Sequence, residues 1–328
     1  MKENSLAEIT KSALLGQAVG DAFGVPVEFL SREEVRALHL HDMVGEGCDL
    51  VAHTRWGDSI PKGSWSDDTS MTVASMASFI KNGGKIDHED QMHQFLNWWH
   101  RDEYCCLPYA FGLGGNISAA LDRFQAKCPA LKCGGRGFMD NGNGALMRIL
   151  PFSLYCIFHG LDAGETAAVV SDGSAITHGH DISKMCCFIW TEFLRSLSEG
   201  GDADTAIDHI EGLALRQWFS DEAVNEVRII ADGKTRLMTE ESICQTGYVV
   251  DTLYSALFSM HHANSFESAI LNAVNLGYDT DTAGAVTGTA AGIRYSVDGI
   301  PERWLNVLGR RDYLESVAAD FSACFPSR

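Results

Sequence analysis

Two short acidic motifs carry the residue types best suited to chemistry in this chain of 328 residues. Both combine paired carboxylates with hydroxyl side chains, and their residues are Ser66, Asp67, Asp68, Asp279, Asp281 and Thr282. A single Asp before a helix usually serves as a cap, but capping needs only one such residue, and paired carboxylates repel each other. Hard cations such as Mg²⁺ take oxygen ligands from carboxylates, hydroxyls and water. The motifs therefore predict a divalent-cation site, with helix capping as the simpler alternative.

Each motif directly precedes a pattern with helical spacing, so we expect both to lie at helix N-termini. Gly284, Gly288 and Gly292 follow the second motif at every fourth residue, and Gly16, Gly20 and Gly24 repeat that spacing near the N-terminus. Small residues at this interval let two helix backbones approach closely. We expect these two helices to lie together beneath the site and to bring Glu28 near Asp279 and Asp281. Two independently packed helices are the alternative, because such spacing also arises by chance.

The rest of the chain reads as helical. Apolar residues recur with a period near 3.6, as in Val249, Val250, Leu253 and Leu257. The 32 glycines gather in connections, and no Pro-rich or Ser-rich linker, low-complexity run or charge block marks a boundary. The sequence therefore predicts an all-α, compact bundle of about a dozen helices that forms a single domain over residues 1–328.

Composition excludes several classes of protein. The formal net charge of −19 repels nucleic-acid phosphates and anionic membranes, so direct nucleic-acid binding is disfavoured. The ten cysteines form no CxxC pair, which indicates reduced thiols. The N-terminus has no apolar core of signal-peptide type, and no run approaches the roughly 18 apolar residues that a membrane span needs. We expect a cytoplasmic protein.

Five motifs together carry a resemblance to a known family. They are, in chain order, GDAFGVPVE, WSDDTSMT, NGNGALMRILP, THGHD and DTDTAG. From about residue 10 to about residue 295 the chain resembles the ADP-ribosylglycohydrolases, which include the dinitrogenase reductase-activating glycohydrolase and the ADP-ribosyl-acceptor hydrolases. The resemblance implies an all-α fold with a binuclear Mg²⁺ or Mn²⁺ centre at the base of an ADP-ribose cleft. It assigns the six residues of the acidic motifs to the metals and Glu28 to catalysis.

The same resemblance implies an activity. The expected reaction is hydrolysis of the bond between ADP-ribose and a modified protein side chain, first of all arginine, which reverses mono-ADP-ribosylation. One alternative is hydrolysis of O-linked ADP-ribose, on serine or as O-acetyl-ADP-ribose. Another is a non-catalytic protein of the same fold that binds ADP-ribose or occludes a partner such as an ADP-ribosylating toxin or transferase. An intact metal set and Glu28 favour catalysis, because a binder needs neither.

Glycine-rich loops are the expected site for the diphosphate. Backbone N–H groups at Gly112, Gly114 and Gly115, and at Asn143 and Gly144 where a helix begins, can cradle phosphate oxygens. The substrate-binding set predicted from these loops and from the THGHD motif is Gly112, Gly114, Gly115, Asn141, Asn143, Gly144 and His178. Simple turns are the alternative for the loops, and a capping or core role is the alternative for His178. No phosphate-binding GxxxxGK[ST] or GxGxxG element occurs, which disfavours nucleotide hydrolysis and dinucleotide redox chemistry.

The chain departs from the family at one informative place. Gly112 stands where many bacterial members have Asp, a natural partner for a guanidinium, and Asp102 or Glu103 could substitute for that acid. The other motif residues are expected to serve the architecture: Asp21 as a buried structural acid and Arg148 in helix packing. Trp98 and Trp99 belong to the core or to the cleft wall, and the sequence does not separate these.

Overall fold

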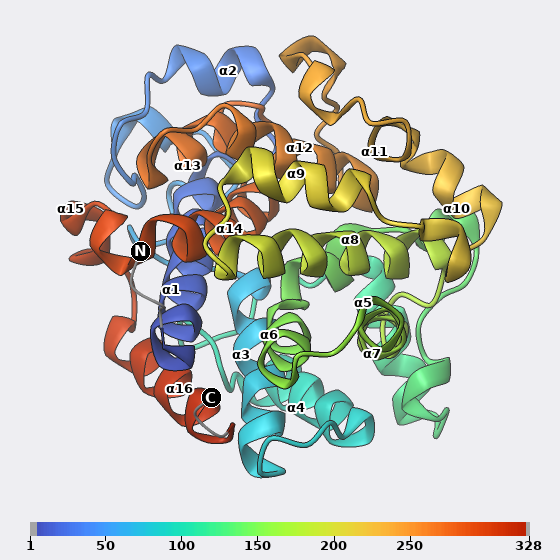
Figure 1. Ribbon diagram of the computed structural model, residues 1–328. Coiled ribbons are helices and arrows are strands. Elements are labelled where there is room, and N and C mark those ends of the chain that lie inside the picture. The colour runs from blue at the N-terminus through green and yellow to red at the C-terminus, as the bar shows by residue number, and fades with distance from the viewer. Residues whose placement is uncertain (1–4, 326–328) are drawn as a thin grey trace.

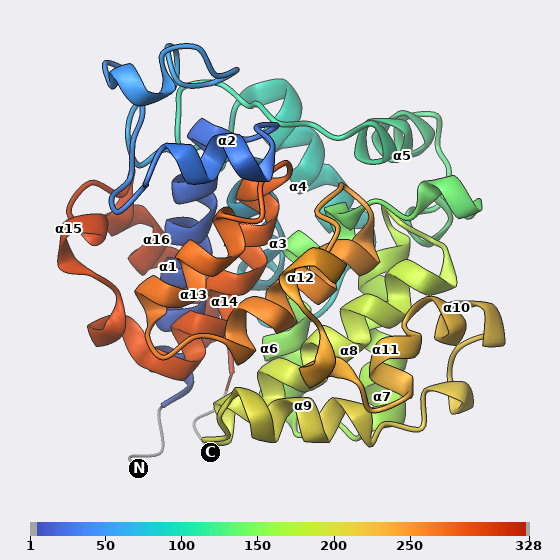
Figure 2. The same ribbon diagram turned by 90° about the horizontal axis from the view of Figure 1, so that it is seen from above.

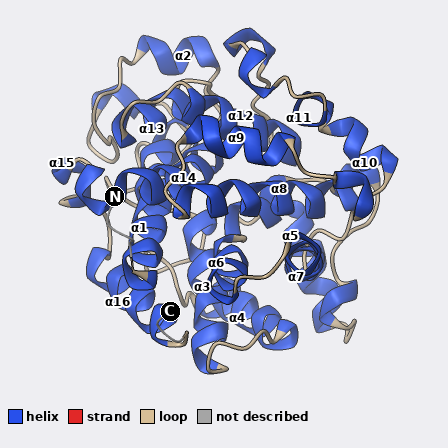
Figure 3. Cartoon of the chain, viewed as in Figure 1, coloured by secondary structure: helices blue, strands red, loops and turns tan. Residues whose placement is uncertain are grey.

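The computed structural model describes residues 5–325 and shows a helical protein throughout that range (Figures 1 and 3). The α-helices are α1 Leu6–Gly24, α2 Arg32–Ala37, α3 Asp67–Lys81, α4 His88–Arg101, α5 Gly115–Gln125, α6 Leu150–His159, α7 Ala163–Ala175, α8 Asp181–Ser198, α9 Ala203–Glu211, α10 Asp221–Glu226, α11 Arg228–Ala231, α12 Val249–His261, α13 Phe266–Val274, α14 Thr280–Gly299, α15 Glu302–Leu305 and α16 Arg311–Ala323.

Short 3₁₀ helices occupy several of the connections between them. They are η1 Val25–Val27, η2 Asp49–Val51, η3 Ala130–Lys132, η4 Phe138–Asp140, η5 Asn143–Arg148, η6 Leu215–Gln217, η7 Thr235–Leu237 and η8 Glu240–Ser242. No strand forms among residues 5–325, where β-pairing is limited to the isolated bridges Gly135 to His178 and Gly142 to Tyr248. The predicted all-α class is confirmed.

Helices α1 and α14 pack tightly against each other and run antiparallel at the centre of the fold (Figures 1 and 2). A Cβ atom added to Gly20 would lie 2.0 Å from the carbonyl oxygen of Gly284, and one added to Gly16 would lie 2.2 Å from that of Gly288. The reciprocal additions on α14 meet the backbone of α1 equally closely. The prediction of two touching glycine faces is therefore confirmed, and the alternative of independently packed helices is wrong.

The close contact between α1 and α14 predicts that adding one methyl group to a glycine in it will lower stability strongly. Gly20→Ala places a Cβ inside the backbone of α14, so the two helices must separate, and overpacking of this kind costs about 1–3 kcal/mol or more. We expect a lower midpoint of chemical unfolding and a loss of metal affinity, because the helix ends that carry the acidic residues move apart. Gly212→Ala is the matched control, since its Cβ would come no closer than 3.4 Å to its neighbours. Equal stability of the two variants would contradict this packing.

The ends of the central helices are set by local sequence. Ser5 caps α1 and forms a capping box with Glu8, and Ser66 caps α3 by accepting a hydrogen bond from the N–H of Asp68. Helix α14 is interrupted near its C-terminus at Ser296, which has a φ of 60°. The predicted helix starts at the two acidic motifs are confirmed by the starts of α3 and α14.

Further helices enclose the central pair and bury a continuous apolar core. Helices α13 and α12 pack against α14, α16 and α3 pack against α1, and α8 packs against α7, α9 and α12. Buried Trp65, Trp98, Trp190 and Trp304 are among the largest core side chains. None of the described helices is both long and apolar enough to cross a membrane.

Candidate active site

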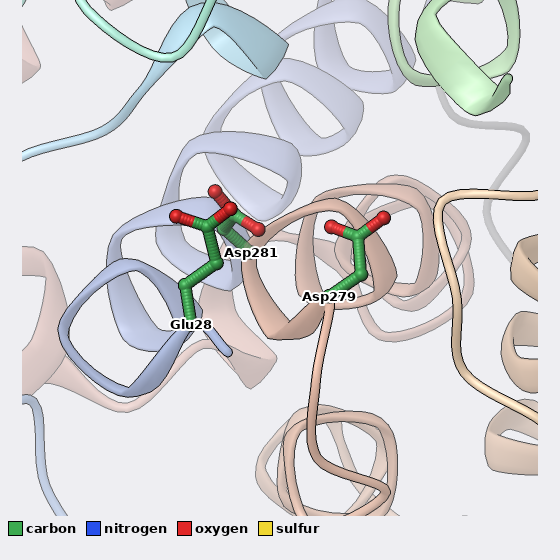
Figure 4. Close-up of side chains that lie close together, drawn as sticks. All are labelled: Glu28, Asp279 and Asp281. Atoms are coloured by element: carbon green, nitrogen blue, oxygen red, sulfur yellow. The ribbon is translucent and has the colours of Figure 1, made fainter. Parts of the chain in front are cut away.

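Three carboxylates from the two ends of the chain meet at one end of the α1 and α14 pair (Figure 4). Glu28 directly follows η1 at the end of α1, and Asp279 and Asp281 stand at the start of α14. One oxygen from each side chain lies within 4.8 Å of the other two. The close packing of the glycine faces produces this meeting, because it brings the end of α1 against the first turn of α14. The predicted proximity of these three residues is confirmed.

The first turn of α3 adds two more buried carboxylates. Asp67 and Asp68 are nearly inaccessible to solvent, and the Thr282 hydroxyl donates to Asp68 Oδ2 at 3.5 Å, which links the two motifs. The Ser66 hydroxyl serves both as the α3 cap and as a donor to Asp68 Oδ2. Asp279 makes no capping hydrogen bond to α14. The cap of α3 is therefore the Ser66 hydroxyl, while in the first turn of α14 the Asp281 carboxylate accepts the N–H of Thr282.

Asp21 holds the first turn of α3 in place. Its carboxylate is fully buried and accepts hydrogen bonds from the backbone N–H groups of Ser66 and Thr69 and from the Thr69 hydroxyl. Burial raises the pKa of Asp21 to about 6, against the lowering effect of these donors. The expectation of a buried structural acid fits this arrangement, because all of these donors come from the turn that presents Asp67 and Asp68.

Three polar side chains outside the acidic set fix the start of α14. The Asn143 amide donates to Asp279 Oδ2 at 2.6 Å, and the Gln245 amide donates to the Asp279 carbonyl at 2.8 Å. The Thr280 hydroxyl donates to the carbonyl of Gly24 on α1 at 2.8 Å. Sequence reasoning missed Gln245, since an isolated Gln in a loop carries no pattern that could have revealed it.

Glu28 has one partner that the sequence did not indicate. The Trp56 indole N–H donates to Glu28 Oε2 at 2.5 Å, across the connection between α2 and α3. Burial raises the pKa of Glu28 to about 7, and the charge of Asp279 adds to this, while the Trp56 hydrogen bond opposes it. A carboxyl group with a pKa near neutrality can both accept and donate a proton at physiological pH.

The other carboxylates of the cluster also resist ionisation in the absence of a cation. Burial comes first and mutual repulsion second in raising the pKa values of Asp67, Asp68 and Asp281 well above their usual range, and burial also raises that of Asp279. Asp68 Oδ1 is buried without a hydrogen-bond partner among the described residues. Crowded, buried carboxylates with an unpaired oxygen are the ligands that hard divalent cations prefer, so the residues present fit such ions.

These pKa shifts predict how stability depends on pH and metal. A carboxyl group whose pKa is raised by folding binds its proton more tightly in the folded state, so it favours folding at low pH and opposes it as pH rises through the folded-state pKa. Divalent cations bind the ionised form and relieve this penalty. We expect Mg²⁺ to raise the melting temperature more at pH 8 than at pH 5.5, as measured by thermal unfolding in buffers that do not chelate metal. A larger Mg²⁺ effect at pH 5.5 would contradict it.

The acidic cluster, which comprises Glu28, Asp67, Asp68, Asp279 and Asp281, lines a cleft with a volume of about 1040 Å³. Several of the predicted substrate-binding residues line it, namely Gly112, Gly114, Gly115, Asn143, Gly144 and His178. Gly114 and Gly115 stand at the N-terminus of α5, as a phosphate cradle requires. Burial lowers the pKa of His178 to about 3, so its ring is neutral and can contact a ligand only as a hydrogen-bonding or packing group.

Two details of the predicted phosphate cradle differ in the structure. Asn141 is not among the residues that line the cleft, because its amide is buried and bonded to Ser183 and to the Phe138 carbonyl. The backbone N–H of Asn143 is not free for a phosphate, because it donates to the carbonyl of Gly247. The prediction of an exposed N–H at Asn143 is therefore wrong, and its side chain instead supports Asp279.

The structure also resolves the remaining expectations about the cleft. Trp98 is buried in the core, whereas Trp99 lines the cleft. Arg148 is fully buried, donates to the Gly173 carbonyl and the Thr177 hydroxyl, and lies over the Phe95 ring, which fits a packing role. Asp102 and Glu103, the two residues that could substitute for an acid at position 112, are not among the residues that line the cleft. The Asp102 carboxylate instead accepts a hydrogen bond from the N–H of Ala110.

Gly112 itself cannot be replaced without local rearrangement. Its φ is +87°, a conformation that side chains rarely adopt, and an added Cβ would lie 2.1 Å from Asp67 Oδ1. The loop backbone therefore rests directly on a carboxylate of the acidic cluster. A side chain at this position would require the Asp67 carboxylate to shift.

Comparison of the fold with solved structures defines the class of protein. The chain matches a structure described as an ADP-ribosylglycohydrolase-related protein complex with a TM-score of 0.75 and 28% identity, over 99% of each chain. The helical fold is thus that of an ADP-ribosylglycohydrolase-related protein. The family model for ADP-ribosylglycohydrolase matches residues 2–327, and this protein belongs to that family.

Two relatives of this chain carry names that describe hydrolysis of ADP-ribose linkages. It is 30% identical to the ADP-ribosylarginine hydrolase Tri1 of Pseudomonas putida (strain GB-1), over 94% of this chain and 76% of the relative. It is 29% identical to the ADP-ribosyl-[dinitrogen reductase] glycohydrolase of Rhodospirillum rubrum, over 90% of this chain and 88% of the relative. These matches confirm the resemblance that the five sequence motifs indicated.

Proposed function

We propose that this protein is a hydrolase that depends on divalent cations and releases ADP-ribose from ADP-ribosylated arginine side chains. The observation that carries the proposal is the meeting of Glu28, Asp279 and Asp281 within 4.8 Å in a cleft that also contains Asp67 and Asp68. Arginine is the favoured acceptor because a similar protein is named for hydrolysis of ADP-ribosylarginine. The reaction would reverse mono-ADP-ribosylation of a protein.

Two Mg²⁺ ions, or Mn²⁺ in their place, are the proposed cofactor. The residues that would hold them are Ser66, Asp67, Asp68, Asp279, Asp281 and Thr282. When bound, the cations would orient the ribose hydroxyls and polarise a water molecule. Asn143 and Asp21 would support this set from outside by fixing Asp279 and the first turn of α3.

Glu28 is proposed to transfer the proton. Hydrolysis breaks the bond between C1″ of the ribose and the acceptor nitrogen and forms a bond from C1″ to the oxygen of water. The proton lost by that water ends on the leaving nitrogen, so the guanidinium departs with its charge unchanged. A carboxyl group with a pKa of about 7 can take this proton and return it. Neighbouring carboxylates would also favour the positive charge that develops on the ribose.

Hydrolysis of an O-linked ADP-ribose is the second candidate, and Gly112 favours it. The loop there holds no acid that could pair with a guanidinium, since a side chain on Gly112 would strike Asp67. A serine acceptor would need no such partner. A non-catalytic binder of ADP-ribose, or of a toxin or transferase, is less favoured, because a binder has no need of Glu28 and four further buried or half-buried carboxylates in the cleft.

A panel of substrates separates these candidates. Arginine-linked, serine-linked and O-acetyl ADP-ribose are incubated with the protein and Mg²⁺, and free ADP-ribose is measured by chromatography. We expect release from the arginine-linked substrate. Release from the serine-linked or O-acetyl substrate alone would favour the second candidate. Binding of ADP-ribose without release from any of the three would overturn the assignment as a hydrolase.

A further inference from the structure

One arginine at the mouth of the cleft is held by aromatic rings. The guanidinium carbon of Arg55 lies 4.8 Å from the centre of the Phe29 ring and 4.6 Å from that of the Trp56 ring. Within residues 5–325 its side chain has no hydrogen bond and no ion pair to a carboxylate. Arg55 is also the only Lys or Arg among the described residues that line the cleft. Two aromatic faces therefore hold the only formal positive charge of the cleft wall.

The rings of Phe29 and Trp56 are both attached to Glu28 of the acidic cluster. The Trp56 indole N–H is bonded to Glu28 Oε2, and its ring packs on Phe111 at a centre-to-centre distance of 5.4 Å. Phe29 immediately follows Glu28 in the chain. A cation that lies on these two rings is therefore beside Glu28.

Phe29 has a strained backbone conformation. Packing of its ring into the core is not the reason, because the residue is exposed. Phe29 has a φ of +70° and Tyr278 has a φ of +58°, both unusual for bulky residues. Two hydrogen bonds hold the pair, from Phe29 N–H to the Tyr278 carbonyl and from Tyr278 N–H to the Leu30 carbonyl, each at 2.6 Å. The Phe29 side chain is nonetheless 53% exposed. Such strain persists where the surroundings enforce it, and it clusters at binding sites.

We propose that the faces of Phe29 and Trp56 form the subsite for the guanidinium group of the acceptor arginine, and that Arg55 fills this subsite in the free protein. This inference rests on the proposed function. A guanidinium is planar, always charged and weakly hydrated, so it stacks readily on aromatic rings. The subsite recognises the leaving group through ring faces beside Glu28, which removes the need for an acid at Gly112. Arg55 must move aside when the substrate enters.

The proposal predicts that removal of Arg55 opens the subsite. The probes are agmatine, which has a guanidinium on a short chain, and 1,5-diaminopentane, which has an ammonium of similar reach. Calorimetry with the full-length, Mg²⁺-loaded protein measures their affinities without any turnover. We expect Arg55→Ala to bind agmatine about 3-fold to 30-fold more tightly than the wild type, as the usual range of cation–π energies implies. The gain for the diamine should be smaller.

A second substitution tests the ring itself. In the Arg55→Ala background, Phe29→Leu removes one aromatic face and should reverse the gain for agmatine. If that variant does not fold, as checked by thermal unfolding, Trp56→Leu removes the other face. Reversal supports the subsite, and a retained gain contradicts it.

Two results with Arg55→Ala would overturn the proposal. The first is no gain for agmatine, and weaker binding of free ADP-ribose in that case would place Arg55 on the phosphates. The second is an equal gain for the diamine, which would show simple charge relief. None of these outcomes depends on hydrolysis. Failure of the substrate panel would therefore overturn the proposed function, whereas failure here would overturn the subsite alone.

Discussion

Replacement of Asp281 by Asn is expected to abolish Mg²⁺-dependent hydrolysis, with a fall in rate of roughly 10³-fold or more, because bound cations supply several kcal/mol of transition-state stabilisation. Asp281 is buried, and one of its oxygens lies within 4.8 Å of oxygens of Glu28 and Asp279. Asn preserves the shape of the side chain but removes the charge that would attract the cation. Mg²⁺ affinity by calorimetry and the rate of ADP-ribose release are the measurements.

The control for this substitution lies on the same helix. Asp298 is exposed near the far end of α14, so Asp298→Asn should leave both Mg²⁺ affinity and rate unchanged. The melting temperature without metal should rise in Asp281→Asn, because one of several mutually repelling buried carboxylates has been neutralised. A stable Asp281→Asn protein with normal Mg²⁺-dependent activity would remove Asp281 from the proposed metal set.

Replacement of Glu28 by Gln is the second substitution with a large expected effect. Loss of a positioned proton-transfer group typically costs roughly 10²-fold to 10⁴-fold in kcat, and we expect a value in this range with little change in the affinity for ADP-ribose. Gln preserves the size of the side chain, and its amide oxygen can still accept the hydrogen bond from the Trp56 indole. Steady-state kinetics with calorimetry of ADP-ribose binding separates kcat from affinity.

Mg²⁺ affinity distinguishes two roles for Glu28. One Glu28 oxygen lies within 4.8 Å of oxygens of both Asp279 and Asp281, so the residue could also serve as a metal ligand. Retained Mg²⁺ affinity in Glu28→Gln supports proton transfer, whereas a large loss of affinity would make Glu28 a ligand. Glu33→Gln, on the exposed face of α2, is the matched control and should match the wild type in both measurements.

The central framework was predictable because its signals are local and periodic. Glycines at every fourth residue on α1 and α14 favour a close helix contact, and the structure has that contact. Carboxylates before two helical patterns indicated two helix starts, and both exist. Once the two helices touch, the position of Glu28 beside Asp279 follows from chain connectivity alone.

The residues that surround the acidic cluster could not be predicted from the sequence in the same way. Trp56 and Arg55 lie in the irregular connection between α2 and α3, where no periodicity fixes which side chains turn inward. The positive φ of Phe29 depends on a hydrogen bond to Tyr278, almost 250 residues away in the chain. Asn143 was correctly placed at the cleft, but a loop sequence does not reveal whether an amide faces a ligand or, as here, a carboxylate.

Metal dependence of ADP-ribose release is the most direct test of the account as a whole. Wild-type protein is stripped with a chelator, and the initial rate of release from an ADP-ribosylarginine peptide is measured before and after Mg²⁺ is restored. We predict no release above background from the stripped protein and full recovery with Mg²⁺. An equal rate with and without metal, or no release in either state, would contradict the proposal that this acidic cleft is a cation-dependent hydrolase site.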